Sequence, residues 1–228
     1  MKKWTTLEHT TTPDGSKLTL SEHDGEYVLR VNGRELMSNK RHASELRLGE
    51  LGGLAKTKAP RILIGGLGLG YTLRGALNRT APDADIVVAE LMPEIVAWNQ
   101  NPAYPLAGDV LSDPRTSVVI GDVYDVITNA ITSNPFDAIL LDADNGTTAM
   151  MTEGNSRLYD TSGLALVRAA LNTHGLAVYW SATREPELER HLKKLGFGVT
   201  TEIVRAYGHG GPRHTLVIAR KLATVPRR

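Results

Sequence analysis

The stretch ILIGGLGLGYTLR, residues 62–74, changes from a continuous apolar run into a glycine-rich turn and then into a helical pattern. The turn contains Gly65, Gly66, Gly68 and Gly70. Glycines at this place allow a tight turn and a close approach of the backbone to a ligand at a helix N-terminus. Tyr71 directly follows and is placed to cover a cation through a cation–π contact. The stretch therefore predicts the first strand–turn–helix unit of a ligand-binding α/β domain.

Strand and helix patterns alternate on the C-terminal side of this turn. Strands are predicted at 61–66, 85–90, 117–122, 136–144, 175–182, 198–207 and 214–220, and helices at 71–79, 93–100, 123–132, 162–173 and 186–196. Continuous apolar strands separated by helices imply a mostly parallel sheet that is covered on both faces. The predicted fold class is therefore α/β, with a Rossmann-like sheet of seven strands that ends in a strand pair.

The N-terminal part of the chain has a different pattern. KLTLSEHDGEYVLRVNG, residues 17–33, alternates apolar and polar residues on both sides of Asp24-Gly25, a strong hairpin signal, and Asn32-Gly33 offers a second turn. We predict an antiparallel β-hairpin lobe over 1–40, a connecting helix and linker over 41–60, and a nucleoside-binding catalytic domain over 61–228.

Composition limits the classes of function. The 228 residues include no cysteine, which excludes a disulfide framework, a Cys-ligated zinc site and a Cys nucleophile. The net charge of +1 gives no reason to expect a nucleic acid partner, and no apolar run reaches the length of a membrane span. The seven histidines lack metal-binding spacing, and His209 and His214 flank a turn where surface positions are expected. We expect a cytoplasmic protein that binds neither nucleic acid nor membrane nor metal.

Carboxylates follow three of the predicted strands. Glu90 ends the second strand, 20 residues beyond Gly70, where an acid accepts hydrogen bonds from both hydroxyls of a ribose. Asp122 and Asp142 end the next two strands. Three acids at neighbouring strand ends suit a cationic ligand with a ribose and an exocyclic amine better than a pyrophosphate. This pattern predicts a sulfonium nucleoside of the S-adenosylmethionine type.

Several segments then resemble the polyamine aminopropyltransferases, the spermidine synthase family, which is built on the class I methyltransferase fold. The glycine loop looks like the family's loop, and FDAILLDADNG stands where the family carries Asp-Ser-Ser-Asp-Pro. The other similar segments are VVAELMPEIVAWN, DPRTSVVIGDVYDVI and RLYDTSGLALVRAAL. The resemblance covers about residues 60–180, and it implies a homodimer that transfers an aminopropyl group to a small amine and releases methylthioadenosine.

The resemblance also implies roles for particular residues. The donor, S-adenosylmethionine or its decarboxylated form, would contact Gly65, Gly66, Gly68, Gly70, Tyr71, Glu90, Leu91, Asp122, Val123 and Asp142. The predicted catalytic residues are Asp142, Asp144, Asn145 and Tyr159, and the predicted acceptor-binding residues are His42, Glu45 and Trp180. Asn145 stands where the family has a second aspartate, and an amide cannot act as a general base.

Alternatives with the same nucleoside pocket stay open. One is methyl transfer from S-adenosylmethionine to a small molecule. Another is attack on the amino-acid chain of S-adenosylmethionine, by 3-amino-3-carboxypropyl transfer or by internal cyclisation. A nucleoside-binding module without activity is a further alternative. A metal-dependent O-methyltransferase is disfavoured, because the fifth strand ends in VYWSATRE and lacks the Asp-Asn pair of an oxygen-rich metal site.

Overall fold

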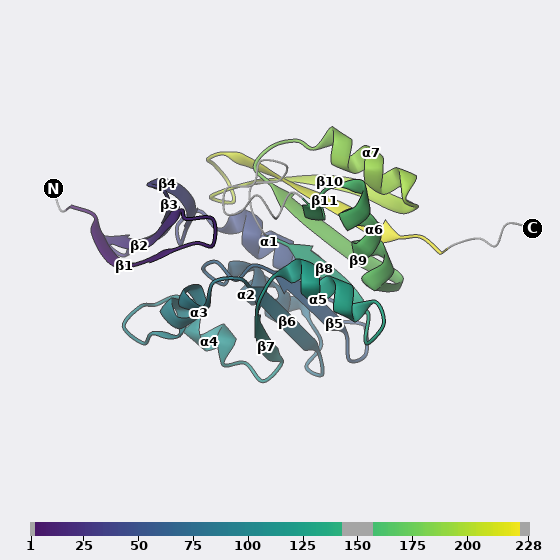
Figure 1. Cartoon of the computed structure of the whole chain (residues 1–228), viewed down its shortest axis with the longest axis horizontal. Coiled ribbons are helices and arrows are strands. Elements are labelled where there is room, and N and C mark those ends of the chain that lie inside the picture. Colours follow the sequence, from purple (N-terminus) through teal and green to yellow (C-terminus); the bar gives the residue numbers. More distant parts are fainter. Residues whose placement is uncertain (1–2, 143–156, 224–228) are drawn as a thin grey trace, which may run out of the picture.

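A computed structural model describes residues 3–142 and 157–223 of the chain. Its main sheet has seven strands in the order β10-β11-β9-β8-β5-β6-β7 (Figure 1). These are β5 (Arg61–Gly65), β6 (Asp85–Glu90), β7 (Thr116–Ile120), β8 (Phe136–Leu141), β9 (Leu171–Ser181), β10 (Phe197–Arg205) and β11 (Arg213–Lys221). The first five run parallel, and β11 is antiparallel to both of its neighbours. The predicted fold class, a mostly parallel seven-stranded Rossmann-like sheet, is confirmed.

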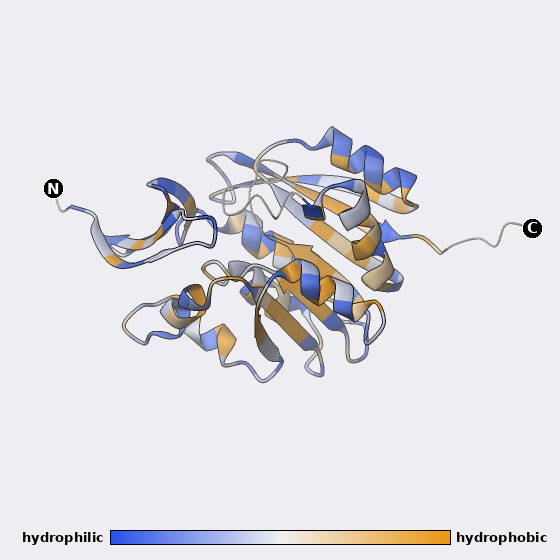
Figure 2. Ribbon diagram, in the orientation of Figure 1, coloured by the Kyte–Doolittle hydropathy of each residue, from blue (hydrophilic) through white to orange (hydrophobic). Residues whose placement is uncertain are grey.

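Helices cover both faces of this sheet. They are α1 (Ala43–Gly52), α2 (Tyr71–Arg79), α3 (Pro93–Gln100), the short α4 (Gly108–Leu111), α5 (Val123–Ala130), α6 (Thr161–Ala170) and α7 (Pro186–Lys194). Successive strand residues point to opposite faces, so Ile62 and Ile64 pack with α1, α2 and α3, whereas Leu63 packs with α5, α6 and α7. β5, β6 and β8 each therefore contain a continuous apolar run, and the central strands are mostly orange in Figure 2.

The N-terminal lobe is a separate antiparallel sheet of four strands. They are β1 (Thr5–Thr11), β2 (Lys17–His23), β3 (Glu26–Val31) and β4 (Arg34–Ser38). Asp24-Gly25 and Asn32-Gly33 have positive φ at both residues, as tight two-residue hairpin turns require. The predicted antiparallel lobe is confirmed, and it contains two strands more than a single hairpin.

The lobe and the main domain share one hydrophobic core. Leu18, Leu20 and Leu29 of the lobe belong to the same buried cluster as the side chains of α1, α2 and α3. Polar contacts also join the two parts, since Tyr104 donates to Glu8 Oε1 at 2.8 Å and Thr10 donates to Glu94 Oε1 at 2.9 Å. The lobe is therefore held against the end of the sheet that carries the glycine loop.

A close helix crossing places α1 over α2. A Cβ atom on Gly49 would lie 2.0 Å from the carbonyl oxygen of Thr72, and one on Gly75 would lie 2.1 Å from that of Leu46. Only glycine permits this contact between backbones. The crossing brings the first turn of α1 beside the first turn of α2, next to the glycine loop.

One helix ends earlier than its sequence pattern suggests. The pattern predicts helix over 162–173, but α6 ends at Ala170 and β9 begins at Leu171, which pairs with Phe136 of β8. Pairing with the neighbouring strand outweighs the local helical preference.

Among the described residues, none of the helices combines the length and the apolar character that a membrane crossing needs.

Candidate functional site

The candidate site lies where the central parallel strands end. Gly65 pairs with Ala89 of β6 and with Leu141 of β8, so the glycine loop begins between Glu90 and Asp142. In an open parallel sheet, ligands bind in the crevice beyond the carboxyl ends of the strands. The structure thus brings together the loop and the acids that the sequence analysis associated with a nucleoside.

Glu90 is buried beneath the glycine loop and organises it. Its side chain is 4% exposed, with Oε2 accepting from the backbone N–H of Leu67 at 2.8 Å and Oε1 from that of Met92 at 2.9 Å. Burial raises the pKa of Glu90, and the hydrogen bonds from backbone amides oppose that rise. Glu90 therefore holds the loop in shape from the end of β6.

Asn99 of α3 fixes the loop from a second side, and the sequence analysis did not identify it. Its amide nitrogen lies 2.8 Å from the carbonyl oxygen of Gly68, and its amide oxygen accepts from the backbone N–H of Ala107 at 3.2 Å. The side chain is 2% exposed. The sequence carried little signal for this role, because Asn99 is the first of three consecutive amide residues, Asn99, Gln100 and Asn101.

Gly70 provides a test of how tightly the loop is built. Its φ is +79°, and a Cβ atom there would lie 2.2 Å from Cβ of Ala107. We expect Gly70→Ala to lower the free energy of unfolding by about 3 kcal/mol or more, from backbone strain plus crowding. Gly25→Ala is the matched control, because Gly25 has a φ of +77° with nothing within 4 Å of its Cβ position.

Chemical denaturation of both variants separates the two effects. Gly25→Ala should lose only the strain contribution, about 1–2 kcal/mol. Equal losses for the two variants would contradict the close packing of the loop against Ala107.

Asp122 has two partners in this structure. Its Oδ1 accepts from the backbone N–H of Tyr124 at 2.8 Å and caps α5, and its Oδ2 lies 2.5 Å from the guanidinium of Arg157. That guanidinium also stacks 4.1 Å above the ring of Tyr124. The next residue after Asp122 is the buried Val123, whose Cγ2 atom would lie only 2.9 Å from a Cβ atom on Gly65. A ligand amine that binds Asp122 therefore has to share this carboxylate with Arg157 or displace the guanidinium. Arg157 was not among the residues predicted from the sequence.

Asp142 follows β8 and is tied to α2. Its Oδ2 accepts from the hydroxyl of Thr72 at 2.7 Å, and its backbone N–H donates to the carbonyl oxygen of Gly65 at 3.1 Å. The same hydroxyl lies 3.3 Å from the carbonyl oxygen of Glu45 in α1. Asp142 is thus positioned by Thr72 of α2 beside the glycine loop, and Thr72 in turn contacts α1. The predicted catalytic residues Asp144 and Asn145 lie outside the described residues.

Two of the predicted ligand residues lie against each other. The rings of His42 and Tyr71 are stacked, with centroids 3.9 Å apart and planes 13° apart. His42 Nδ1 lies 2.7 Å from the carbonyl oxygen of Asn39, and the Tyr71 hydroxyl donates to the same oxygen at 3.3 Å. Burial raises the pKa of Tyr71. Tyr71, predicted to contact the sulfonium donor, therefore packs directly on His42, predicted to bind the amine acceptor.

Glu45 and Trp180, both predicted to bind the acceptor, flank a buried polar group. The Ser44 hydroxyl lies 2.5 Å from Oε2 of Glu45 and 2.7 Å from Nδ1 of His214. The ring of His214 lies 4.8 Å from that of Trp180. Burial raises the pKa of Glu45 and lowers that of His214. His214 was expected on the surface beside a turn, but the structure half-buries it, because β11 brings it onto α1.

Tyr159, predicted to be catalytic, lies in the core on the other face of the sheet. Its side chain is 7% exposed, and its ring centroid is 5.9 Å from that of the fully buried Tyr179. Both tyrosines pack with the residues of α5, α6 and α7, whereas Trp180 packs on the opposite face. The structure does not bring Tyr159 together with Glu45 or Trp180.

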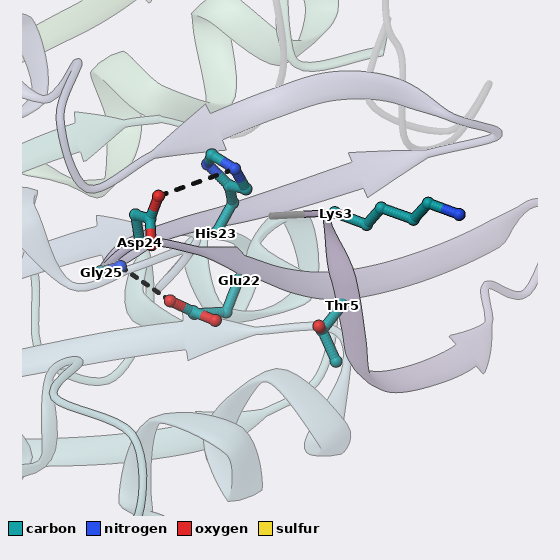
Figure 3. A pocket seen from close by; sticks show the side chains of 6 residues that line it. All are labelled: Lys3, Thr5, Glu22, His23, Asp24 and Gly25. Carbon is teal, nitrogen blue, oxygen red and sulfur yellow. Dashed lines mark hydrogen bonds and ion pairs between the residues drawn. The ribbon is translucent and has the colours of Figure 1, made fainter. Parts of the chain in front are cut away.

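A separate polar pocket of about 650 Å³ lies on the N-terminal lobe, away from the strand ends (Figure 3). It is lined by Lys3, Thr5, Glu22, His23, Asp24 and Gly25. None of the predicted site residues, including those of the glycine loop, is among the residues that line it. Within the part of the chain that the structure describes, three or more potential metal ligands do not gather at any one place. We therefore locate the candidate site at the strand ends and not in this pocket.

Comparisons with known proteins agree with this architecture. No protein-family model matches the chain, and no curated protein sequence matches it. A crystal structure of spermidine synthase in complex with the transition-state analogue AdoDATO is 17% identical, with a TM-score of 0.73. The spermidine synthase of Thermotoga maritima is 16% identical, with a TM-score of 0.69. Each comparison covers 95% of this chain and 72% of the other. The predicted resemblance is thus confirmed at the level of structure: the chain has a spermidine synthase-like fold.

Proposed function

We propose that this chain is a transferase that moves an aminopropyl or related alkyl group from a sulfonium nucleoside to a small amine. The donor is S-adenosylmethionine or its decarboxylated form. The observation that carries the proposal is the set of carboxylates around one glycine loop, at the ends of neighbouring parallel strands: Glu90, Asp122 and Asp142.

The strand order suggests how the donor lies in the site. Asp142, the glycine loop, Glu90 and Asp122 follow one another along β8, β5, β6 and β7. Adenine then lies beside Asp122, the ribose beside Glu90, and the sulfonium beside the loop and Asp142. A carboxylate near the sulfonium attracts both the positive sulfur and an incoming ammonium group.

This reaction requires little covalent chemistry from the protein. The amine nitrogen attacks a carbon attached to the sulfonium, the carbon–sulfur bond breaks, and its electron pair stays on sulfur to leave a neutral thioether. Holding the nitrogen in line with that bond is the main contribution of the site. Asp142, held by Thr72 at 2.7 Å, is placed to orient the attacking amine.

Product analysis distinguishes this reaction from its alternatives. We expect methylthioadenosine when the protein is incubated with the decarboxylated donor and a diamine or polyamine. Methyl transfer would instead release S-adenosylhomocysteine from S-adenosylmethionine, or its decarboxylated counterpart from the decarboxylated donor, and methylthioadenosine formed without an acceptor would show internal cyclisation. Calorimetry with both donors and with methylthioadenosine is the companion measurement. Absence of binding to all three would overturn every enzymatic assignment made above.

AdoDATO, which one structural neighbour binds as a transition-state analogue, offers a sharper probe. An analogue of this kind binds at least about 100-fold more tightly than the substrate it mimics. We expect the chain to bind AdoDATO with that advantage over the decarboxylated donor, in competition calorimetry. Equal affinities would argue that the site does not favour the geometry of propyl transfer.

A further inference from the structure

The buried group formed by Ser44, Glu45 and His214 is an unusual feature of the acceptor side. Ser44 is 0% exposed and Glu45 is 4% exposed, at the start of α1, and His214 lies at the start of β11. The serine hydroxyl stands between the other two groups, 2.5 Å from the carboxylate and 2.7 Å from Nδ1. Both distances are those of good hydrogen bonds.

The single hydroxyl proton of Ser44 couples its two neighbours. An ionised Glu45 only accepts, so Ser44 donates to it and must accept from an N–H at Nδ1 of His214. Nε2 then carries the lone pair. If Glu45 is protonated, the whole chain reverses: the carboxyl donates to Ser44, Ser44 donates to Nδ1, and Nε2 carries the proton. The protonation of Glu45 and the tautomer of His214 are therefore linked.

Hydrogen bonds through Thr72 link the helix turn that carries Ser44 and Glu45 to Asp142 in the proposed reaction centre. The carbonyl oxygen of Glu45 is 3.3 Å from the Thr72 hydroxyl, which binds Asp142 at 2.7 Å. Trp180, whose ring packs on His214, is 8% exposed, and its Nε1 is buried without a hydrogen-bond partner among the described residues. A buried N–H left without a partner costs free energy, so it points to a polar ligand atom at this place.

We infer that His214 accepts a proton from the incoming amine and that Ser44 passes it on to Glu45, an inference that rests on the proposed alkyl transfer. The amine arrives as an ammonium ion and gives one proton to Nε2 of His214. The proton on Nδ1 moves to Ser44, and the serine proton moves to the Glu45 carboxylate. The freed lone pair attacks carbon, the carbon–sulfur bond breaks toward sulfur, and the product leaves as a secondary ammonium ion.

Charges around the group suit this transfer. An alkylammonium has a pKa of about 10, far above that of an ordinary carboxyl group. Burial raises the pKa of Glu45 and narrows this gap. Burial lowers the pKa of His214, and the positive charge of Arg41 lowers it further, so the imidazole starts neutral. Ser44 and the ring of Trp180 on β9 contact His214, Val204 on β10 is its pairing partner, and the charge of Arg41 acts on it. Glu45 is connected to His214 through Ser44.

Two variants interrupt this proton relay, which runs from the amine through His214 and Ser44 to Glu45, at different points. His214→Asn keeps an N–H for Ser44 but lacks the second ring nitrogen, and Ser44→Ala removes the bridging hydroxyl. We expect each to lower turnover by about 100-fold or more, the usual contribution of a general base, with donor affinity unchanged. The rates of both variants should climb toward the wild-type rate as pH rises, because the amine then loses its proton to solvent.

Matched controls separate catalysis from stability. Ser181→Ala removes another buried serine that donates to a buried glutamate, Glu185, at 2.8 Å, with no histidine in the pair. His174→Asn removes an exposed histidine at the start of β9, away from the site. Both controls should keep wild-type turnover. Wild-type turnover in the Ser44 or His214 variant, or a loss that is the same at every pH, would overturn the relay.

A measurement without substrate keeps this inference apart from the proposed function. Nitrogen-15 NMR of the full chain at pH 8 should show His214 as the Nδ1–H tautomer, shifting toward Nε2–H in Ser44→Ala. Nε2–H in the wild type, or no shift in the variant, would overturn the relay even if the chain transfers alkyl groups. If no donor and acceptor react, the proposed function fails, and the NMR result alone decides whether the relay is present.

Discussion

Asp142→Asn is expected to abolish turnover while nucleoside binding weakens only modestly. Asparagine keeps the size of the side chain and an oxygen for the Thr72 hydroxyl, which lies 2.7 Å from Oδ2 in the wild type. It removes the negative charge beside the sulfonium and the incoming ammonium. Loss of one such electrostatic contact in a site shielded from water lowers the rate by about 100- to 1,000-fold.

The measurement pairs steady-state rates of methylthioadenosine formation with calorimetry of methylthioadenosine binding. Affinity should change by less than about 10-fold, which corresponds to about 1.4 kcal/mol. Asp125→Asn is the matched control, because Asp125 is an exposed acid in the first turn of α5. Intact turnover in Asp142→Asn would show that this acid serves only to hold α2 against β8.

Glu90→Gln is expected to weaken nucleoside binding by about 100-fold or more, since it disturbs both the loop and the acceptor for ribose hydroxyls. Each carboxylate oxygen of Glu90 accepts from a backbone N–H, at 2.8 Å from Leu67 and 2.9 Å from Met92. A glutamine side chain must turn its own NH₂ group toward one of these donors. Leaving a buried donor unsatisfied costs about 1–3 kcal/mol.

The matched control for this variant is Glu185→Gln, which alters a glutamate that is 6% exposed and lies at the start of α7. Calorimetry with methylthioadenosine should show wild-type affinity for the control and weak binding for Glu90→Gln. Equal affinities for the two variants would remove Glu90 from the nucleoside site.

The pH dependence of stability gives a second measure of Glu90. Burial raises its pKa in the folded state above the ordinary value of 4.5. Between the unfolded and the folded pKa, the folded state holds a proton that the unfolded state has released. The contribution of Glu90 to the free energy of unfolding therefore falls as pH rises through that range. Denaturation of Glu90→Gln from pH 4.5 upward should lack this contribution.

Local sequence patterns were sufficient to predict the alternation of strands and helices from β5 to β11, apart from the short α4. Strands such as Ile62–Ile64 are apolar at every position because both faces of the sheet are covered, and this property is visible in a short window. The two hairpin turns of the lobe follow from residues that tolerate positive φ. The glycine loop and the acids at the strand ends were recognisable for the same reason, because a parallel sheet collects all of its strand ends at one edge.

Relations between distant segments could not be predicted in this way. Arg157 meets Asp122 from 35 residues away, and Asn99 reaches the carbonyl oxygen of Gly68 from 31 residues away. Tyr159 lies in a segment that resembles the spermidine synthase family, but its ring packs against Tyr179 in the core on the other face of the sheet. A residue's type and neighbours do not reveal which face of a sheet it joins when both faces are apolar.

The sequence by itself thus determined the α/β class, the antiparallel lobe, the glycine loop and the strand-end acids, because each is encoded in a few consecutive residues. Only the tertiary structure joined Ser44 to His214, which are separated by 170 residues, and linked the first turn of α1 to Asp142 through Thr72. The physical reason is that these contacts depend on the close crossing of α1 over α2 and on β11 returning antiparallel beside β9. Both arrangements depend on packing across the whole domain, and no short stretch of sequence encodes them.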